Sequence, residues 1–230
     1  MIDDEGKQIF DVLNNFVDKR LDGKETILSM KKSNSNNWKQ MEWIGWFLEE
    51  ESRMLLSSKI GGTKGPSFGN TAFDYKNKYV WDIKSHSVED KNGVSKTECI
   101  LNDEEAIDRA LNEYGVVGFV IYTYKPDYDI SGDFKKWHDE LKGEISEYEK
   151  ERMKRNAPSR SRKSGCVIKS LIIIKLTKED IEKGQREGWI KDFQKGMRNA
   201  DGSPRRNKIT IKIDKVPANC IIVKSGPNLF

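Results

Sequence analysis

Asp74, Asp82 and Lys84 are the residues of this sequence whose types and spacing best suit chemistry. Residues 79–85 are rich in aromatic and β-branched side chains, which predicts a strand. The polar residues 76–78 predict a turn from a preceding strand, so the two strands form a hairpin that brings Asp74 close to Asp82. Successive side chains of a strand point to opposite faces, and Asp82 and Lys84 therefore share one face.

Two carboxylates and one amine at a single point suit a hard divalent cation. Mg²⁺ prefers oxygen ligands and usually takes one or two carboxylates together with water. We expect Asp74 and Asp82 to hold the ion, helped by the main-chain carbonyl of Ile83. The ion would polarise a phosphate and activate water, while Lys84 orients that water and stabilises developing negative charge. The alternative is an ordinary Asp–Lys ion pair at a sheet edge, because Asp-x-Lys tripeptides are common.

Length and composition limit the class of protein. A chain of 230 residues fits one domain with a sizeable core, and 34% of its residues are charged, with a net charge of +4. Cys99, Cys166 and Cys220 are isolated and no C-x-x-C pair exists, which argues against a zinc ribbon or a disulfide framework and is typical of a reducing cytoplasm. The acidic N-terminus lacks the pattern of a signal peptide, and no apolar run approaches a membrane span. We therefore expect a cytoplasmic protein without a membrane partner.

Two segments before the hairpin must help to position these residues. Residues 38–57 predict an amphipathic helix, in which either Glu42 or Glu49 could lean over the two aspartates as an additional carboxylate. The glycine-rich residues 61–70 predict an irregular segment. This segment is either a connector or a loop whose backbone approaches a nucleic-acid phosphate near Asn70.

Downstream of the hairpin, strand and helix patterns alternate. Residues 96–100 predict a short strand, and Asn102 is a suitable N-cap for a helix that Gly115 ends. Residues 116–124 form a nearly continuous apolar run, typical of a buried strand parallel to its neighbours, and Pro126 is expected to end it. The order is therefore helix, three strands, helix and strand. Beyond this core we expect a long helix, a strand, two short helical pieces and two strands, at residues 134–156, 167–176, 177–183, 187–195, 208–213 and 220–224.

Basic residues gather in two segments of the later half of the chain. The denser run lies within residues 152–163, and the second flanks a Gly-Ser-Pro turn. Basic side chains next to serine fit phosphate contact and base reading in DNA, whereas a solvated loop is the plainer alternative. The candidate DNA-binding residues from these segments are Lys154, Arg155, Ser159, Arg160, Arg162, Lys163, Arg205 and Arg206.

The element order and the spacing of Asp74, Asp82 and Lys84 resemble the PD-(D/E)xK nuclease superfamily over residues 38–124. The residue before Asp74 is Phe73 rather than the Pro of the motif, and this position varies in such enzymes. The resemblance implies an α/β (α+β) fold with a restriction-endonuclease-like core, in which helices flank a mixed β-sheet, and an elaborated C-terminal region.

The same resemblance implies an activity. It is Mg²⁺-dependent cleavage of phosphodiester bonds, with Asp74 and Asp82 as metal ligands and Lys84 positioning or activating water. Glu49 or Glu42 would match the helix carboxylate that many members carry, and the shorter spacing to Asp74 favours Glu49.

The chain also resembles type II restriction endonucleases, in particular the archaeal MjaI-like group, at residues 38–45, 82–86, 134–138 and 157–163. This resemblance implies sequence-specific cleavage of double-stranded DNA at a short palindrome such as CTAG. A palindrome is matched by a two-fold homodimer with one active site per strand. Ser85 and His86, which follow Lys84, would then contact DNA together with Asn70.

We expect one nuclease domain over residues 1–230, with a catalytic core at about 38–124 and a DNA-recognition elaboration at about 125–230. Two alternatives keep the same fold. A structure-specific or repair nuclease would show less sequence preference, and a catalytically inactive DNA-binding protein would keep the scaffold without cleavage. A protein whose basic runs are only solvated faces would lack the steep salt dependence of a phosphate binder.

Overall fold

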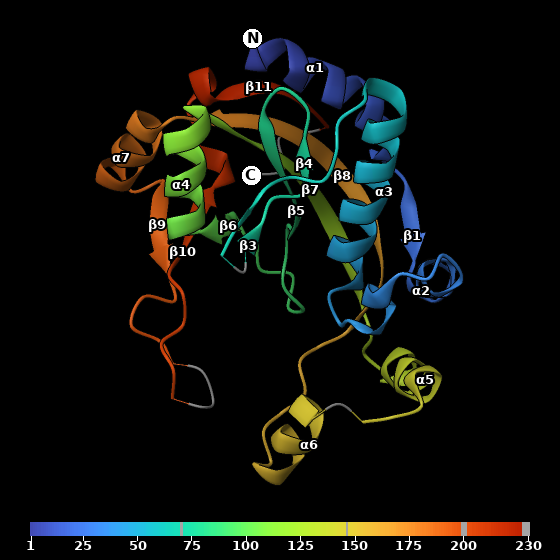
Figure 1. Ribbon diagram of the computed structural model, residues 1–230. Helices are drawn as coiled ribbons and strands as arrows, with labels where there is room; N and C mark the ends of the chain where they lie inside the picture. The colour runs from blue at the N-terminus through green and yellow to red at the C-terminus, as the bar shows by residue number, and fades with distance from the viewer. Residues whose placement is uncertain (70, 146, 199–201, 227–230) are drawn as a thin grey trace.

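One large mixed sheet lies at the centre of the computed structural model, which describes residues 1–69, 71–145, 147–198 and 202–226. The strands of this sheet are β1 (Arg20–Asp22), β4 (Tyr75–Lys76), β5 (Val80–Ser87), β7 (Val117–Tyr128), β8 (Lys163–Leu176) and β11 (Ile221–Ser225). Their order is β1-β8-β7-β5-β4, and β11 also pairs with β8 (Figure 1). β7 was predicted to be parallel to its neighbours, and it is parallel to β5 but antiparallel to β8. The other neighbouring strands are antiparallel as well.

Other elements cover both faces of the sheet (Figure 1). A separate hydrophobic core lies on each face. One face packs against α1 (Ile2–Leu13), α2 (Gly23–Lys32) and α3 (Trp43–Ile60). The other packs against α4 (Glu104–Tyr114), α7 (Lys178–Glu187) and a small antiparallel sheet of β6 (Glu98–Asp103), β10 (Lys208–Lys212) and β9 (Ile190–Phe193). Alternate residues of β5 divide between the two cores, because Trp81 and Ile83 belong to the first and Val80 to the second. The predicted class, helices flanking a mixed sheet, is confirmed.

Two further parts of the chain lie outside these layers. α5 (Asp133–Lys142) and α6 (Glu147–Lys154) extend from the end of the body that β7 and β8 reach, and residues 194–198 after β9 extend toward the same end (Figure 1). β2 (Ser67–Phe68) and β3 (Thr71–Ala72) form a separate two-stranded ladder before the hairpin. None of the helices in the described ranges is long and apolar enough to cross a membrane.

Pro126 does not end β7, contrary to the prediction. The strand continues to Tyr128, with β8 paired along its length. β5 stops at Ser87, opposite Tyr124, so the last part of β7 has a strand partner on one side only. Proline lacks the N–H of a ladder hydrogen bond and is tolerated where one edge of a strand is unpaired.

Two predictions in the later half are wrong because a glycine interrupts the pattern. The helix predicted over residues 134–156 is two helices, since Gly143 takes a φ of 73° and ends α5. The helical piece predicted over 187–195 is instead largely strand β9, because Gly188 takes a φ of 75° and ends α7. The glycine expected after α4, Gly115, does end that helix, with a φ of 76°.

Candidate active site

β4 and β5 form the predicted hairpin, and its register sets two aspartates against each other. Tyr75 pairs with Trp81 in antiparallel register, which places Asp74 opposite Asp82. The backbone N–H of Asp74 donates to the carbonyl of Trp81 at 3.2 Å, so the pairing extends to this position. Lys84 follows Asp82 on the same face of β5, and all three side chains meet at the edge of the sheet.

Hydrogen bonds fix one oxygen of each carboxylate. Asp74 Oδ2 accepts from the backbone N–H of Ile83 at 2.7 Å. Asp82 is fully buried, and its Oδ2 accepts from Lys84 Nζ at 2.7 Å and from Asn102 Nδ2 at 3.0 Å. Asp82 Oδ1 is also buried but has no hydrogen-bond partner. A buried acceptor without a donor is costly, so this oxygen is where a ligand would satisfy an unmet bond.

Glu49 of α3 lies beside this pair and interacts with Asp74. Burial and the negative charge of Asp74 raise the pKa of Glu49 from 4.5 to about 7. Burial also raises the pKa of Asp82 well above its ordinary value, and Asp74 adds to that increase against the opposing charge of Lys84. Three carboxyl groups therefore lie near the Lys84 ammonium, with Arg53 as a weaker cation near Glu49, and additional positive charge would stabilise their ionised forms.

Lys84 stays protonated in this setting. Burial acts to lower its pKa, but the negative charges of Asp82 and Asp74 outweigh that effect and raise the pKa above its ordinary range. Lys84 is 22% exposed, so its ammonium can still contact a molecule that enters the site. A permanently charged lysine can orient water and stabilise negative charge, but it cannot accept a proton near neutral pH.

The carboxylates fit a hard cation as a pair rather than as a larger group. Within the described part of the chain, no group of three or more His, Cys, Asp or Glu side chains is arranged to hold a metal ion. Mg²⁺ commonly binds through one or two carboxylates, with water filling its other positions. Asp74 and Asp82 supply such a pair, and the unpaired Oδ1 of Asp82 is a ready ligand atom.

The structure separates the two glutamates between which the sequence left a choice. Glu42 is the N-cap residue of α3, is exposed, and pairs with Arg160 at 3.5 Å. Glu49 lies about two turns further along the helix, where its carboxyl group interacts with Asp74 and Lys84. Glu49 is therefore the helix carboxylate at the aspartate pair.

Four of the predicted DNA-binding residues line one cavity of about 480 Å³ beside this site. They are Ser85, His86, Arg160 and Lys163. The cavity also reaches Cys99, whose thiol interacts electrostatically with Lys84 and Asp82. Residues from the end of β5 and from the basic run thus meet next to the carboxylates.

Two of these cavity residues already have partners inside the protein. His86 Nε2 lies 2.8 Å from the carbonyl oxygen of Lys96, and burial lowers the pKa of His86. Lys163 Nζ donates to the hydroxyl of Tyr124 at 2.6 Å. Burial likewise lowers the pKa of Lys163. A DNA contact by either side chain would add to or replace these bonds.

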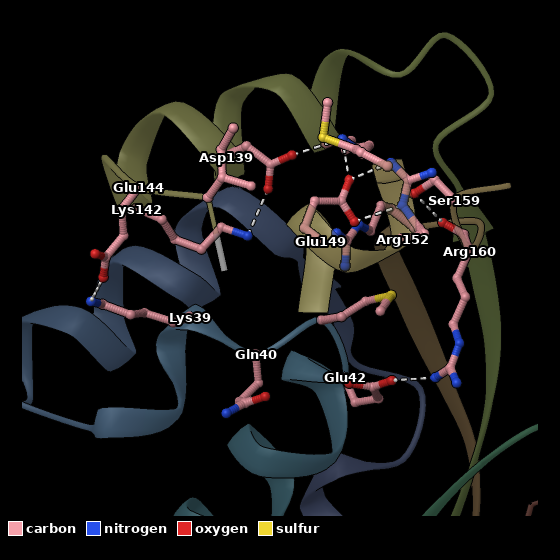
Figure 2. Close-up of a pocket in the computed structure, with 15 residues that line it drawn as sticks. Lys39, Gln40, Glu42, Asp139, Lys142, Glu144, Glu149, Arg152, Ser159 and Arg160 are labelled. Atoms are coloured by element: carbon pink, nitrogen blue, oxygen red, sulfur yellow. Dashed lines mark hydrogen bonds and ion pairs between the residues drawn. The ribbon is translucent and has the colours of Figure 1, made fainter. Parts of the chain in front are cut away.

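The other residues of the basic run divide between the surface and a second cavity. Lys154 and Arg155 are exposed near the end of α6 and both bond to Glu151, at 2.7 and 3.2 Å. Ser159 and Arg162 line a cavity of about 610 Å³ under α5 and α6 (Figure 2).

One residue of the second basic patch bonds to Asp103, the neighbour of Asn102. Arg206 Nη1 donates to Asp103 Oδ2 at 3.2 Å and to Thr71 Oγ1 at 3.1 Å. Arg205 is exposed, and its backbone N–H is bonded within the segment between β9 and β10. Asn70 lies outside the described residues.

Sequence patterns missed two residues that hold the site together. Asn102 was expected to cap α4, but Asp103 is the N-cap residue and the Asn102 amide binds Asp82 instead. Glu5 of α1 is buried and its Oε1 accepts from the indole N–H of Trp81 at 2.8 Å, beside Asp82. Glu5 Oε2 also accepts from the backbone N–H of Lys78 in the hairpin turn at 3.2 Å. The position of Asn102 after a strand pattern could have signalled its role, whereas no local pattern links Glu5 to the hairpin.

The arrangement can bind a cation, keep a lysine charged beside it and offer a carboxylate that exchanges its proton near neutral pH. Comparison of the chain with models of protein families, with curated proteins and with solved structures finds no match. What the chain does must therefore be inferred from its own residues.

Proposed function

We propose that the protein is a Mg²⁺-dependent endonuclease that cleaves phosphodiester bonds of double-stranded DNA. The observation that carries this proposal is the pair of opposed aspartates beside a charged lysine. One buried oxygen of Asp82 has no partner there. These groups match the chemistry of phosphodiester hydrolysis, which needs a cation on the phosphate, a positioned water and positive charge near the leaving group.

Each residue of the site has a role that its surroundings support. Asp74 and Asp82 would hold Mg²⁺, with the carbonyl of Ile83 as a further ligand. When bound, the ion polarises the phosphate and makes water more acidic. Lys84, which stays protonated, orients the water and stabilises the negative charge of the phosphate. Glu49 has a pKa of about 7, so it can take a proton from water near neutral pH.

Double-stranded DNA is the substrate that the surroundings of the site favour. The cavity at the end of β5 begins at Ser85, next to Lys84 in the strand, and is lined by Arg160 and Lys163. It shares Arg160 with the cavity lined by α5 and α6. Cations placed on both sides of a cleavage site can hold the phosphates that flank the scissile bond. The specific form that we propose is a homodimeric restriction endonuclease that cuts at a short palindrome such as CTAG, because two-fold symmetry places one site on each strand.

The test is cleavage of a long duplex DNA of known sequence, with Mg²⁺ or with EDTA, read on a gel. We expect discrete fragments with Mg²⁺ only. Asp82→Asn should abolish cleavage but still bind DNA, because the carboxylate serves the metal rather than DNA. Glu113→Gln, an exposed change on α4, is the matched control and should cleave normally.

Other outcomes separate the alternatives. A smear of products would favour a structure-specific or repair nuclease of the same fold. Intact DNA that the protein still shifts on a gel would favour a catalytically inactive DNA-binding protein. Undiminished cleavage by Asp82→Asn would refute the site assignment.

A further inference from the structure

Arg162 is a buried cation that lines a cavity. Only 9% of its surface is exposed, and it lies just before β8. It lines one cavity together with residues of α5 and α6. The cavity has a volume of about 610 Å³ and is bounded by these helices and by the chain that enters α3 (Figure 2). A cavity of this size can hold a small molecule or a segment of a larger ligand.

The acidic side chains of the cavity are already paired with other bases. Asp139 binds Lys135 at 2.8 Å and Lys142 at 2.6 Å, and Glu149 binds Arg152 at 2.7 Å. The two remaining acids make longer pairs, Glu144 with Lys39 at 3.4 Å and Glu42 with Arg160 at 3.5 Å (Figure 2). Each acid of the lining therefore has a counterion other than Arg162.

Arg162 itself makes no ion pair within 4 Å in the part of the chain that the structure describes. Its buried Nε has no hydrogen-bond acceptor there. The Arg162 charge does help to lower the pKa of Glu149, but the hydrogen bond of that carboxylate to Arg152 is the larger cause. The neighbouring His138 supplies no negative charge, since burial lowers its pKa to about 4 and leaves the ring neutral.

A buried guanidinium without a counterion is costly, because arginine keeps its charge at every physiological pH. The planar group carries donors in a fork that matches two oxygens of a phosphate or a carboxylate. The lining has six basic and four acidic side chains, so an anion would also balance its charge. The charge and geometry of the cavity thus favour binding of an anion.

We propose that this cavity binds a phosphate group, with Arg162 as its buried contact and Arg160 and Ser159 as further donors from the same segment. The phosphate is either part of a DNA backbone or carried by a free nucleotide or inorganic phosphate. The first source rests on the proposed function, because the cavity shares Met41, Glu42 and Arg160 with the cavity beside the active site. The phosphate site itself does not depend on nuclease activity.

The experiment compares the full-length wild type with Arg162→Met and with Arg155→Met. Arg155 belongs to the same basic run but is exposed and outside this cavity, so it is the matched control. In one arm, thermal unfolding is followed in a phosphate-free buffer with added inorganic phosphate or AMP. In the other, binding of a short duplex DNA is measured in EDTA, where cleavage is blocked.

We expect Arg162→Met to fold at least as well as wild type without phosphate, because replacing an unpaired buried charge by an apolar side chain of similar length is neutral or stabilising. Thermal stabilisation by phosphate or AMP that is lost in Arg162→Met only would identify a free phosphate ligand. Roughly tenfold or greater loss of duplex affinity in that variant, beyond the loss in Arg155→Met, would identify the DNA backbone.

Equal behaviour of the two variants in both arms would overturn the proposal. A clear loss of stability of Arg162→Met without phosphate would do the same, because it would show that the guanidinium has a structural counterion. Cleavage with Mg²⁺ is measured in parallel. Arg162-dependent phosphate binding by a wild type that cuts no DNA would refute the nuclease and leave this site standing.

Discussion

Replacing Glu49 by Gln should remove a pH-dependent loss of stability from this protein. The pKa of Glu49 rises from 4.5 to about 7 on folding, mainly through burial. Each pKa unit corresponds to about 1.4 kcal/mol, so ionised Glu49 costs the folded state about 3 kcal/mol. Gln resembles the protonated acid in shape and carries no charge.

The sign follows from the direction of the shift. Below about pH 4.5 the carboxyl group is protonated in both states, and the two proteins should be equally stable. As the pH rises through 4.5 toward 7, the unfolded state loses its proton first, and the wild type loses stability relative to Glu49→Gln. Above this range the variant should be the more stable protein by about 3 kcal/mol.

Urea unfolding at several pH values between 4 and 8.5 measures this difference. The difference between wild type and variant cancels the titration of all other groups that the change leaves unaffected. Glu113→Gln, at an exposed position of α4, should show no such divergence. Parallel stability curves for wild type and Glu49→Gln, or a variant less stable at pH 8, would refute the placement of Glu49 beside Asp74.

Three other changes have outcomes that the geometry fixes. Lys84→Met leaves buried Asp82 with only Asn102 as a donor. The free energy of unfolding should therefore fall by about 3–5 kcal/mol near pH 8, and by less in acid, where Asp82 is protonated. Urea unfolding at both pH values measures this difference. Asn102→Ala removes a donor that orients the Asp82 carboxylate, so it should weaken Mn²⁺ binding by about 10–100-fold, measured by calorimetry. Unchanged affinity would count against a metal at Asp82. Gly62→Ala should lower the free energy of unfolding by about 1–3 kcal/mol, because φ is +91° and the new Cβ would lie 2.6 Å from a tyrosine hydroxyl. Gly93→Ala is the control for backbone strain alone, because Gly93 has a φ of +76° but open space around its Cβ position.

The geometry at the centre of the site was predictable because it is local. A strand pattern, a short turn and side-chain alternation suffice to set Asp74 against Asp82 and to put Lys84 on the same face. The burial of β7 and its parallel pairing with β5 were likewise predictable from an unbroken apolar run, but its antiparallel pairing with β8 was not.

Partners distant in the sequence were not predictable in this way. Glu5 reaches Trp81 from the first helix, and Asn102 reaches Asp82 from a strand of another sheet. The end of a helix at a single glycine was also not predicted, since Gly143 interrupts a charged helical pattern that otherwise runs without a break. Periodicity reports which face of an element is apolar, but it does not report what that face meets.

The central position of β8 bears on when the site matures during synthesis. β8 pairs with β1, β7 and β11, so it joins the earliest strand of the chain to the latest. A nascent chain can close the β4–β5 hairpin from neighbouring residues alone, but β7 gains its second strand partner only after residues 163–176 have left the ribosome. The carboxylates are therefore synthesised early, but the sheet that supports them is completed late. Most of the chain must be synthesised before the site can hold a ligand firmly.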